Sequence, residues 1–261
     1  MVILNTPISR PPSALFERLW TSSRFHICAD GGANRLYEAT QDSQSDFLLE
    51  KYVPNAIRGD LDSLHDHVRD YYASKQVLIE KDPSQDTNDL DKALQKIVSV
   101  REFKADDEPS ALPSSITLPY DQVIIYGGFG GRFDQEMASI QALYKWADTF
   151  QNRLWLYSDE TSAVLIPAGK VVELAVPFQG HHAIREGPMC GLIPMGAKCE
   201  SITTSGFQWN LEDSEMEFGG LVSTSNSILG NTDGVVTIET SNPIIFTAEI
   251  VCQTKASQPA T

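Results

Sequence analysis

Short apolar runs alternate with helical patterns through about the first 160 residues, and this alternation constrains the fold more than any other feature. A helix is expected at 13–20, and strands are expected at 2–5, 25–30, 77–80, 123–128 and 154–158. Helical spacing links Leu90, Ala93, Leu94, Ile97 and Val98, and it also links Phe133, Met137, Ile140 and Tyr144. The pattern predicts an α/β N-terminal domain, 1–160, with a mostly parallel sheet covered by helices.

The pattern changes after about residue 165, where no helix-length period remains. Short β-rich runs separated by turn residues occupy 170–178, 190–196, 200–211, 220–229, 234–240 and 243–251. The Asp-Gly pair at 233–234 favours a hairpin between the two runs that flank it. We therefore expect an all-β C-terminal domain at 165–261, of sandwich or barrel type, joined to the first by a short linker around 159–170.

Composition and charge limit the partners of the chain. The 35 acidic and 20 basic side chains give a net charge of −15, which repels nucleic acids and anionic membranes. The sequence has no signal-peptide pattern and no apolar run near the ~20 residues that span a bilayer. Its four cysteines are far apart, with no C-x-x-C pair, so reduced thiols and a cytoplasmic location are expected.

Two polar segments interrupt the N-terminal pattern, at 41–46 and 104–119. The longer is rich in Pro, Ser and acidic residues, which is typical of an exposed connecting loop. We expect neither segment to contribute to a functional site.

The segment CADGGANRLY (28–37) places an acid and two glycines at the end of a predicted strand. Ligands of open parallel sheets bind outside the carboxyl ends of the strands, where loops meet helix N-termini. Gly31 and Gly32 would allow a ligand to approach the backbone closely behind Asp30. The alternative is that Asp30 only caps the following helix.

Two further segments carry paired acids. In RGDLDSL (58–64), an extended backbone would point Asp60 and Asp62 to one face, as in sites for hard cations, although such pairs are also common in surface turns. In QDTNDLDKAL (85–94), which begins an amphipathic helix, we expect Asp86 to be the cap and Asp89 a candidate ligand.

The fourth segment, YGGFGGRFDQ (126–135), holds four glycines between a strand and a helix. It lacks the P-loop pattern and the last glycine of G-x-G-x-x-G. Backbone N–H groups of such a loop can bind phosphate, and Arg132 can add a guanidinium; the alternative is a structural turn with an exposed arginine.

Taken together, these four segments fall at one edge of one predicted sheet. Acids for a cation beside glycines and an arginine for phosphate are what a metal–triphosphate site requires. A divalent cation would also reconcile the negative charge of the chain with an anionic nucleotide.

In order and spacing, these segments resemble the catalytic domain of eukaryotic thiamine pyrophosphokinases, most closely the fungal members. The resemblance continues through CGLIPMG (190–196), TTSGFQWNL (203–211), LVSTSNSI (221–228) and VVTIETSNPIIF (235–246), which are similar to the thiamine-binding domain of that family. It covers essentially the whole chain outside the two polar loops. Where many relatives are expected to have Thr-Asp, this chain has Asn88-Asp89, so the role of residue 88 is the open point.

What the resemblance implies is a homodimeric, Mg²⁺-dependent enzyme that moves diphosphate from ATP to thiamine and releases AMP. It implies a metal–phosphate cluster of Asp30, Asp60, Asp62 and Asp89, and a catalytic set of Asp60, Asp62, Asp89 and Arg132. The nucleotide-binding residues it implies are Asp30, Asn34, Arg58, Gly128, Arg132 and Asp134. Those it implies for thiamine are Gln85, Trp209, Ser223, Ser225 and Asn226, although Trp209 would otherwise be a core tryptophan of the β domain.

Two alternatives remain at this point. G-D-L-D-S also fits the nucleophilic D-x-D of an aspartyl-phosphate phosphatase, but no lysine stands at an obvious matching place and the glycines would be unexplained. A catalytically inactive nucleotide- or thiamine-binding protein is disfavoured because Asp30, Asp60, Asp62 and Asp89 are all intact. The sequence does not say which aspartate, if any, accepts the proton of the alcohol.

Overall fold

The computed structural model describes residues 1–41, 47–102, 122–176, 188–229 and 234–250. The chain divides into two compact units: Met1–Lys145 with Leu156–Asp159, and Trp146–Trp155 with Glu160–Thr261. The loop expected at 104–119, and all but the first residue of that expected at 41–46, lie outside the described residues. Within the described ranges, none of the helices is both long and apolar enough to span a bilayer.

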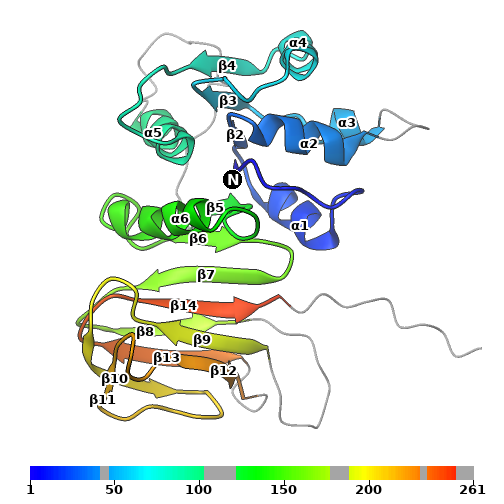
Figure 1. Cartoon of the computed structure of the whole chain (residues 1–261). Coiled ribbons are helices and arrows are strands. Elements are labelled where there is room, and N and C mark those ends of the chain that lie inside the picture. The colour runs from blue at the N-terminus through cyan, green and yellow to red at the C-terminus, as the bar shows by residue number, and fades with distance from the viewer. Residues whose placement is uncertain (42–46, 103–121, 177–187, 230–233, 251–261) are drawn as a thin grey trace, which may run out of the picture. The chain divides into compact units, whose positions relative to one another are not determined.

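The first unit is built on a sheet whose strands are mostly parallel (Figure 1). Its strand order is β6–β5–β1–β2–β3–β4. The bounds are Val2–Ile3 for β1, Ile27–Ala29 for β2, Ala56–Gly59 for β3, Leu78–Lys81 for β4, Val123–Tyr126 for β5 and Leu154–Tyr157 for β6. In β1, Val2 pairs in parallel with Ile27 of β2 on one side and with Ile125 of β5 on the other. The chain thus reverses its direction of strand addition between β1 and β5, and such a switch point is where open α/β sheets bind ligands.

Six helices of the described residues connect these strands. They are α1 (Ala14–Ser22), α2 (Gly32–Thr40), α3 (Phe47–Lys51), α4 (Asp66–Ser74), α5 (Asp89–Glu102) and α6 (Phe133–Lys145). Helices α5 and α6 lie on one face of the sheet, with α1 and α2 on the other (Figure 1). The expected strands at 77–80 and 123–128 and the helix expected at 13–20 all correspond to real elements, within a few residues.

The start of α5 differs from the sequence prediction. The cap is Asn88, whose Oδ1 accepts a hydrogen bond from the backbone N–H of Asp91 at 2.8 Å; the prediction of Asp86 was wrong. The side chain of the residue directly before a helix can accept a hydrogen bond from the backbone N–H of the third helical residue. Asp86 lies too far upstream to do so. Capping therefore gives residue 88 a physical role, because Asn88 fixes where the helix carrying Asp89 begins.

Helix α6 forms as its periodicity predicts, but its buried side is different. Ser139, Ala142 and Leu143 are buried, whereas Phe133 is 71% exposed. The helix is tied to α5 by an ion pair of 2.8 Å between Lys145 and the buried Asp91. The two helices that border the switch point are thus linked by a charge pair, which the apolar spacing alone did not indicate.

The second unit is a sandwich of two antiparallel sheets. One has the order β12–β9–β14–β7 and the other β11–β10–β13–β8. The bounds are Thr161–Ile166 (β7), Val171–Ala175 (β8), Met189–Ile193 (β9), Cys199–Ser205 (β10), Ser214–Met216 (β11), Ser223–Ser227 (β12), Val235–Thr240 (β13) and Ile244–Glu249 (β14). Side chains of both sheets, including Val164, Ile202, Ile238 and Phe246, share one apolar core. The fold class expected from the sequence, an α/β domain followed by an antiparallel β domain, is confirmed.

Two local expectations in this unit are wrong. The predicted hairpin at 233–234 does not form, because β12 pairs with β9 while β13 pairs with β10 and β8 in the other sheet. The linker expected at about 159–170 contains β7, which pairs along its whole length with β14 and is buried from Ser162 to Ile166. In both places the local sequence pattern was overridden by pairing with strands that are distant in the chain.

Candidate active site

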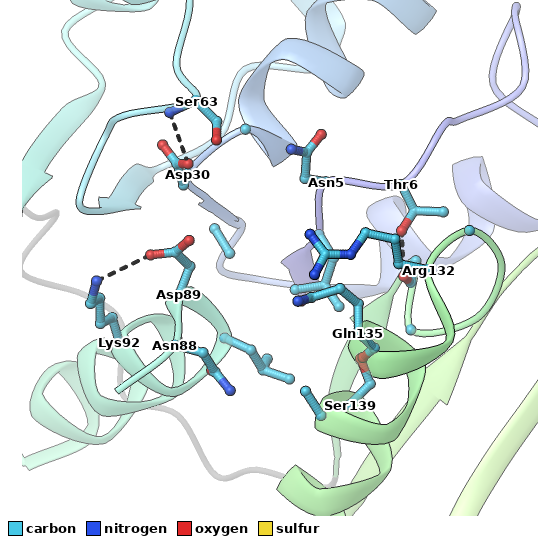
Figure 2. Close-up of a pocket in the computed structure, with 18 of the residues that line it drawn as sticks. Asn5, Thr6, Asp30, Ser63, Asn88, Asp89, Lys92, Arg132, Gln135 and Ser139 are labelled. Carbon is cyan, nitrogen blue, oxygen red and sulfur yellow. Dashed lines mark hydrogen bonds and ion pairs between the residues drawn. The ribbon is translucent and has the colours of Figure 1, made fainter. Parts of the chain in front are cut away.

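A cleft of about 660 Å³ opens at the switch point of the first unit. It is lined by the segments that follow β1, β2, β3, β4 and β5, together with the first turns of α5 and α6. Asp30 and Asp89 lie on one side of the cleft, and Arg132 and Gln135 lie on the other (Figure 2). The cleft thus gathers the four segments that the sequence singled out, plus residues Leu4–Pro7, which it did not.

Three carboxylates meet on one side of the cleft. One oxygen from each of Asp30, Asp60 and Asp89 lies within 4.8 Å of the others. The Nζ of Lys92 is 3.3 Å from Asp89 Oδ1 and 3.9 Å from Asp60 Oδ2. We call Asp30, Asp60, Asp89 and Lys92 the acidic wall. Oxygen ligands at this spacing are suited to a hard divalent cation.

The backbone that brings these acids together is unusual in two ways. Gly59 ends β3 where a Cβ would lie 2.7 Å from Asp30 Cβ and 3.0 Å from Asp89 Oδ1, so only glycine permits this approach. Asp30 and Leu61 both have left-handed backbone conformations, with φ of 43° and 62°. Strained backbone of this kind persists where the surrounding structure imposes it, and it is concentrated at functional sites.

Asp30 is the most deeply buried member of the acidic wall. It is 4% exposed, and its Oδ2 accepts a hydrogen bond from the backbone N–H of Ser63 at 3.2 Å (Figure 2). Its Oδ1 is buried without a hydrogen-bond partner. A buried carboxylate oxygen without a partner is costly, and a bound cation would satisfy it.

Burial also acts on Asp89. Loss of solvent raises the pKa of the Asp89 carboxyl, while the hydrogen bond from Lys92 acts in the opposite direction. The carboxylates of Asp30 and Asp60 add to the upward shift. Such a shift, from burial and like charges together, is typical of acids at a functional site.

Asp62, the fourth predicted ligand, is not among the three clustered carboxylates. Its side chain is 76% exposed and lies 3.8 Å from Lys81 Nζ. Its backbone N–H donates to Asp60 Oδ1 at 3.1 Å, which makes the D-x-D segment a turn rather than an extended strand. The positive φ of Leu61 explains why the two side chains do not share a face.

The opposite side of the cleft is formed by residues 127–132, which we call the glycine loop. Gly127 has φ of +91°, and Thr6 Oγ1 donates to its carbonyl at 2.7 Å. The N–H of Gly130 donates to Glu136 Oε1 at 2.7 Å. One of the backbone donors expected to face phosphate is thus bonded to a carboxylate of the chain itself.

Arg132 forms a two-point ion pair with Asp134. Its Nε and Nη2 lie 3.0 Å and 2.5 Å from the two carboxylate oxygens, and both side chains are largely exposed. Asp134 raises the pKa of Arg132, and Arg132 in turn lowers the pKa of Asp134. The structure therefore shows Asp134 in contact with Arg132, and both Arg132 and Gly128 line the cleft.

Three more predicted residues belong to the first unit. Gln85 lines the cleft. Asn34 is buried and bonds both sides of the turn after Asp62, donating to the Ser63 carbonyl and accepting from the His65 N–H. Arg58 is not among the residues lining the cleft; it is paired with Glu80 and Asp82 at 3.3 and 2.9 Å. Asn34 and Arg58 thus hold the loops that surround the acidic wall.

The predicted thiamine residues of the second unit lie around β12. Trp209 is 59% exposed, and its backbone is bonded at both its N–H and its carbonyl by the side chain of Asn226. Ser225 has φ of 56° and sits, exposed, at an irregularity in the pairing of β12 with β9 that begins at Ser223. The structure thus brings Trp209 and Asn226 together and leaves the indole accessible, so Trp209 is not a core tryptophan.

Several cleft residues were missed by the sequence analysis, namely Asn5, Thr6, Ser63, Lys92, Gln135 and Ser139. Asn5 and Thr6 follow the first predicted strand, so the rule on carboxyl ends of strands could have found them. Lys92 is one helical turn after Asp89, which was also a readable signal. Gln135 and Ser139 are recognisable only once α6 is known to border the cleft (Figure 2).

Comparison with known proteins agrees with this architecture. A family model described as "Thiamin pyrophosphokinase, catalytic domain" matches residues 16–156, and one described as "Thiamin pyrophosphokinase, vitamin B1 binding domain" matches residues 178–245. Thiamine pyrophosphokinase 3 of Oryza sativa is 35% identical, over 96% of this chain and 86% of the relative. Thiamine pyrophosphokinase 1 of Arabidopsis thaliana is 34% identical, over 96% and 85%.

Solved structures give the same result. The crystal structure of yeast thiamin pyrophosphokinase superposes with a TM-score of 0.79 at 29% identity, covering 96% of this chain and 85% of the other. That of the Bacillus subtilis thiamine pyrophosphokinase has a TM-score of 0.68 at 18% identity and supports the fold alone. The fold defines a class of proteins with an α/β unit that has a cleft at its switch point, followed by a β sandwich. The chain belongs to the thiamine pyrophosphokinase family.

Proposed function

We propose that this chain catalyses the ATP-dependent formation of thiamine diphosphate. The hydroxyl oxygen of thiamine attacks the β-phosphorus of ATP, the bond from that phosphorus to the oxygen bridging it to the α-phosphorus breaks, and AMP leaves. The proton of the hydroxyl passes to an acceptor in the cleft. The observation that carries the proposal is the acidic wall, which faces the glycine loop across the cleft in a chain of this family.

We assign Mg²⁺ to the acidic wall, held by Asp30, Asp60 and Asp89. The residues fit this ion, because three carboxylates offer hard oxygen ligands and Asp30 Oδ1 is buried without another partner. When bound, the ion would neutralise the charge that develops on the non-bridging phosphate oxygens. Asp62, exposed at the edge of the acidic wall, remains a predicted fourth ligand.

The other side of the cleft is assigned to the phosphates of ATP. Arg132, the last residue of the glycine loop, offers a planar guanidinium with several hydrogen-bond donors, and its ion pair with Asp134 fixes the orientation of the side chain. We assign Gly128, which lines the cleft, to the same ligand, although its lack of a Cβ serves packing against β6, where that atom would lie 3.2 Å from Leu156 Cδ2. Asn34 and Arg58 keep the neighbouring loops in place. The Arg132 guanidinium can bind phosphate oxygens of the nucleotide once it leaves Asp134.

Thiamine is assigned to Gln85, Trp209, Ser223, Ser225 and Asn226. The exposed indole of Trp209 provides a flat face for a cationic ring, and Asn226 fixes the backbone that carries it. In this scheme residues 1–160 bind ATP, and residues 165–261 bind the vitamin together with Gln85. We also assign the enzyme to the cytoplasm.

The phosphatase alternative is not favoured. One argument against it, the missing lysine, was wrong, because Lys92 lies beside Asp60 in the folded chain. What opposes it is membership of a diphosphotransferase family over nearly the whole length. The glycine loop, which a phosphatase would leave unexplained, is also part of the cleft.

One assay tests the proposal directly. The protein is incubated with thiamine, ATP and Mg²⁺, and AMP and thiamine diphosphate are both quantified. Equal amounts of the two products are expected. Release of inorganic phosphate without AMP would favour the phosphatase. A folded protein that forms no product would favour a catalytically inactive nucleotide- or thiamine-binding protein.

The enzyme is also proposed to be a homodimer whose active sites each combine the acidic wall of one chain with Trp209 of the other. The motivation is the family resemblance, since a two-fold axis lets each chain complete the site of its partner. Asp60→Asn and Trp209→Ala, each inactive alone, are mixed by co-expression. A shared site predicts recovery to roughly a quarter of normal activity, because half of the dimers are mixed and each has one intact site. No recovery despite mixed dimers by mass spectrometry would reject sharing and leave the enzymatic assignment intact.

A further inference from the structure

A buried lysine at the acidic wall has no part in the transfer chemistry described so far. The Lys92 side chain is only 2% exposed, yet its ammonium is at hydrogen-bond distance from Asp89 and 3.9 Å from Asp60 (Figure 2). Burying an ammonium group is costly unless nearby charges compensate for its lost hydration. The Lys92 ammonium is therefore held in the cleft by the carboxylates of the acidic wall, and it is not a surface charge.

The start of α5 holds Lys92 in place. Asn88 caps the helix, and its carbonyl accepts the hydrogen bond of the Lys92 N–H at 3.1 Å. Asp89 and Lys92 are three residues apart, so they lie on the same side of the first turn. Asp89, the proposed cation ligand, and Lys92 are thus both carried by the first turn of α5, which fixes their relative position.

Counting charges shows what Lys92 contributes. Asp30, Asp60 and Asp89 together carry three negative charges, of which a divalent cation balances two. Lys92 supplies the third positive charge. Among the described residues that line the cleft, the other cation is Arg132, which is exposed and paired with Asp134. Without Lys92, the loaded acidic wall would keep a net negative charge facing the triphosphate.

We propose that Lys92 is a positioning residue that sets the charge of the acidic wall, so that the wall is neutral when one divalent cation is bound. This inference rests on the proposed function, because it takes the acidic wall as the cation site. It has two consequences of opposite sign. Lys92 weakens binding of the cation to the nucleotide-free protein, since it repels a second positive charge, and it strengthens binding of the nucleotide afterwards.

Two binding measurements on the full chain test this without turnover. Mn²⁺ alone, which prefers the same oxygen ligands as Mg²⁺, is titrated by electron paramagnetic resonance. The α,β-methylene analogue of ATP, whose bond to be broken is blocked, is titrated by calorimetry in saturating Mg²⁺. For Lys92→Met we expect Mn²⁺ to bind at least about tenfold more tightly and the analogue at least about tenfold more weakly.

Two further variants serve as controls. Lys92→Arg keeps the positive charge and should restore both affinities to within about threefold of the unchanged protein. Lys96→Met removes the same charge one turn along α5, where the lysine pairs with Glu80 at 2.8 Å and is not among the residues lining the cleft. It should change neither affinity by more than about twofold, because a pair outside the cleft faces neither ligand.

Tighter binding of Mn²⁺ together with weaker binding of the ATP analogue in Lys92→Met is the result that supports the inference. Mn²⁺ affinity that is unchanged or weaker in Lys92→Met, or analogue affinity that is unchanged, would overturn it, because a lysine with a merely structural role would weaken both or neither. If circular dichroism shows that Lys92→Met does not fold, Lys92→Gln, which keeps a polar end, is measured in the same way. Failure of the proposed function is separate: it appears as absence of AMP and thiamine diphosphate from the unchanged protein.

Discussion

The two sides of the cleft differ in how far their charged groups are prepared for a ligand. On the acidic wall, three carboxylates from different segments converge: Asp30 is buried, Asp60 and Asp89 are half-buried, and one oxygen of Asp30 has no hydrogen-bond partner. On the glycine loop, Arg132 is 75% exposed and bonded to its neighbour Asp134, and the Gly130 N–H is bonded to Glu136. The acidic wall is thus preorganised for a cation, while Arg132 and the Gly130 N–H of the glycine loop are already bonded to carboxylates of α6.

The difference has a physical reason. A carboxylate cluster can be buried only if other parts of the fold hold it there, so its geometry must be built before the ligand arrives. An exposed arginine keeps its hydration and can exchange one carboxylate for a phosphate at little cost. We therefore expect substitutions on the acidic wall to act on turnover, and substitutions on the glycine loop to act mainly on nucleotide binding.

The largest effect is expected at the acidic wall. Asp60→Asn and Asp89→Asn should each lower turnover at least about a hundredfold at saturating Mg²⁺, the scale seen when a charge-stabilising group is lost. Circular dichroism should show an intact fold. Normal turnover in both would mean that the clustered carboxylates do not take part in catalysis.

Asp62→Asn is the matched control for that experiment, because it removes the same charge two residues away from Asp60. Because its side chain is exposed and paired with Lys81, we expect a smaller loss than for Asp60→Asn. A loss of equal size would show that the Asp62 carboxylate joins the acidic wall once the cation binds, as the sequence analysis predicted.

The next effect is expected on the glycine loop. Arg132→Ala should lower kcat/KM for ATP by about ten- to a hundredfold, mostly through KM, because it removes donors to phosphate. Asp134→Asn should have a smaller effect, since the guanidinium is kept. If Arg132→Ala instead lowered kcat with KM unchanged, the contrast between the two sides of the cleft would not hold.

A third prediction concerns the pH dependence of the stability of the strand that leads to Asp30. His26 directly precedes β2, the strand that Asp30 follows. Its ring stacks on Trp20 with centroids 3.8 Å apart, and burial lowers its pKa from 6.5 to about 4. Between pH 6.5 and pH 4 the unfolded chain therefore binds more protons at His26 than the folded chain does. The free energy of unfolding is highest above pH 6.5 and decreases as the pH falls through this range.

We expect this histidine to cost about 1 kcal/mol of stability between pH 6.5 and pH 5.5. His26→Gln should lose that part of the pH dependence, as measured by urea unfolding at each pH. Activity that falls in the same range in both proteins would then not be due to the loss of stability at His26. Equal stability slopes would mean that His26 is not held neutral.

The smallest effect is expected at Glu136, which accepts from the Gly130 N–H. Glu136→Gln keeps an acceptor of similar shape but removes a negative charge from the side that receives phosphate. KM for ATP should therefore fall by up to about threefold, with kcat nearly unchanged. A rise in KM would show that the carboxylate holds the glycine loop in its binding shape.

Much of this protein was determined by local sequence. The alternation of strands and helices, the acids after β2 and β3, and the glycines after β5 each follow from residues close together in the chain, because side-chain period and turn chemistry are short-range properties. Asp30, Asp60 and Asp89 could therefore be grouped at one edge of the sheet before the structure was known.

Other features were decided by the tertiary structure alone. The position of α6 places Gln135 and Ser139 in the cleft, helix packing buries Lys92 beside Asp60, and the separation of β12 from β13 excludes the hairpin. A left-handed residue at position 61 turned Asp62 away from its expected partner. The physical reason is common to all: periodicity tells which face of an element is buried, but the neighbour it is buried against is chosen by packing among residues far apart in sequence.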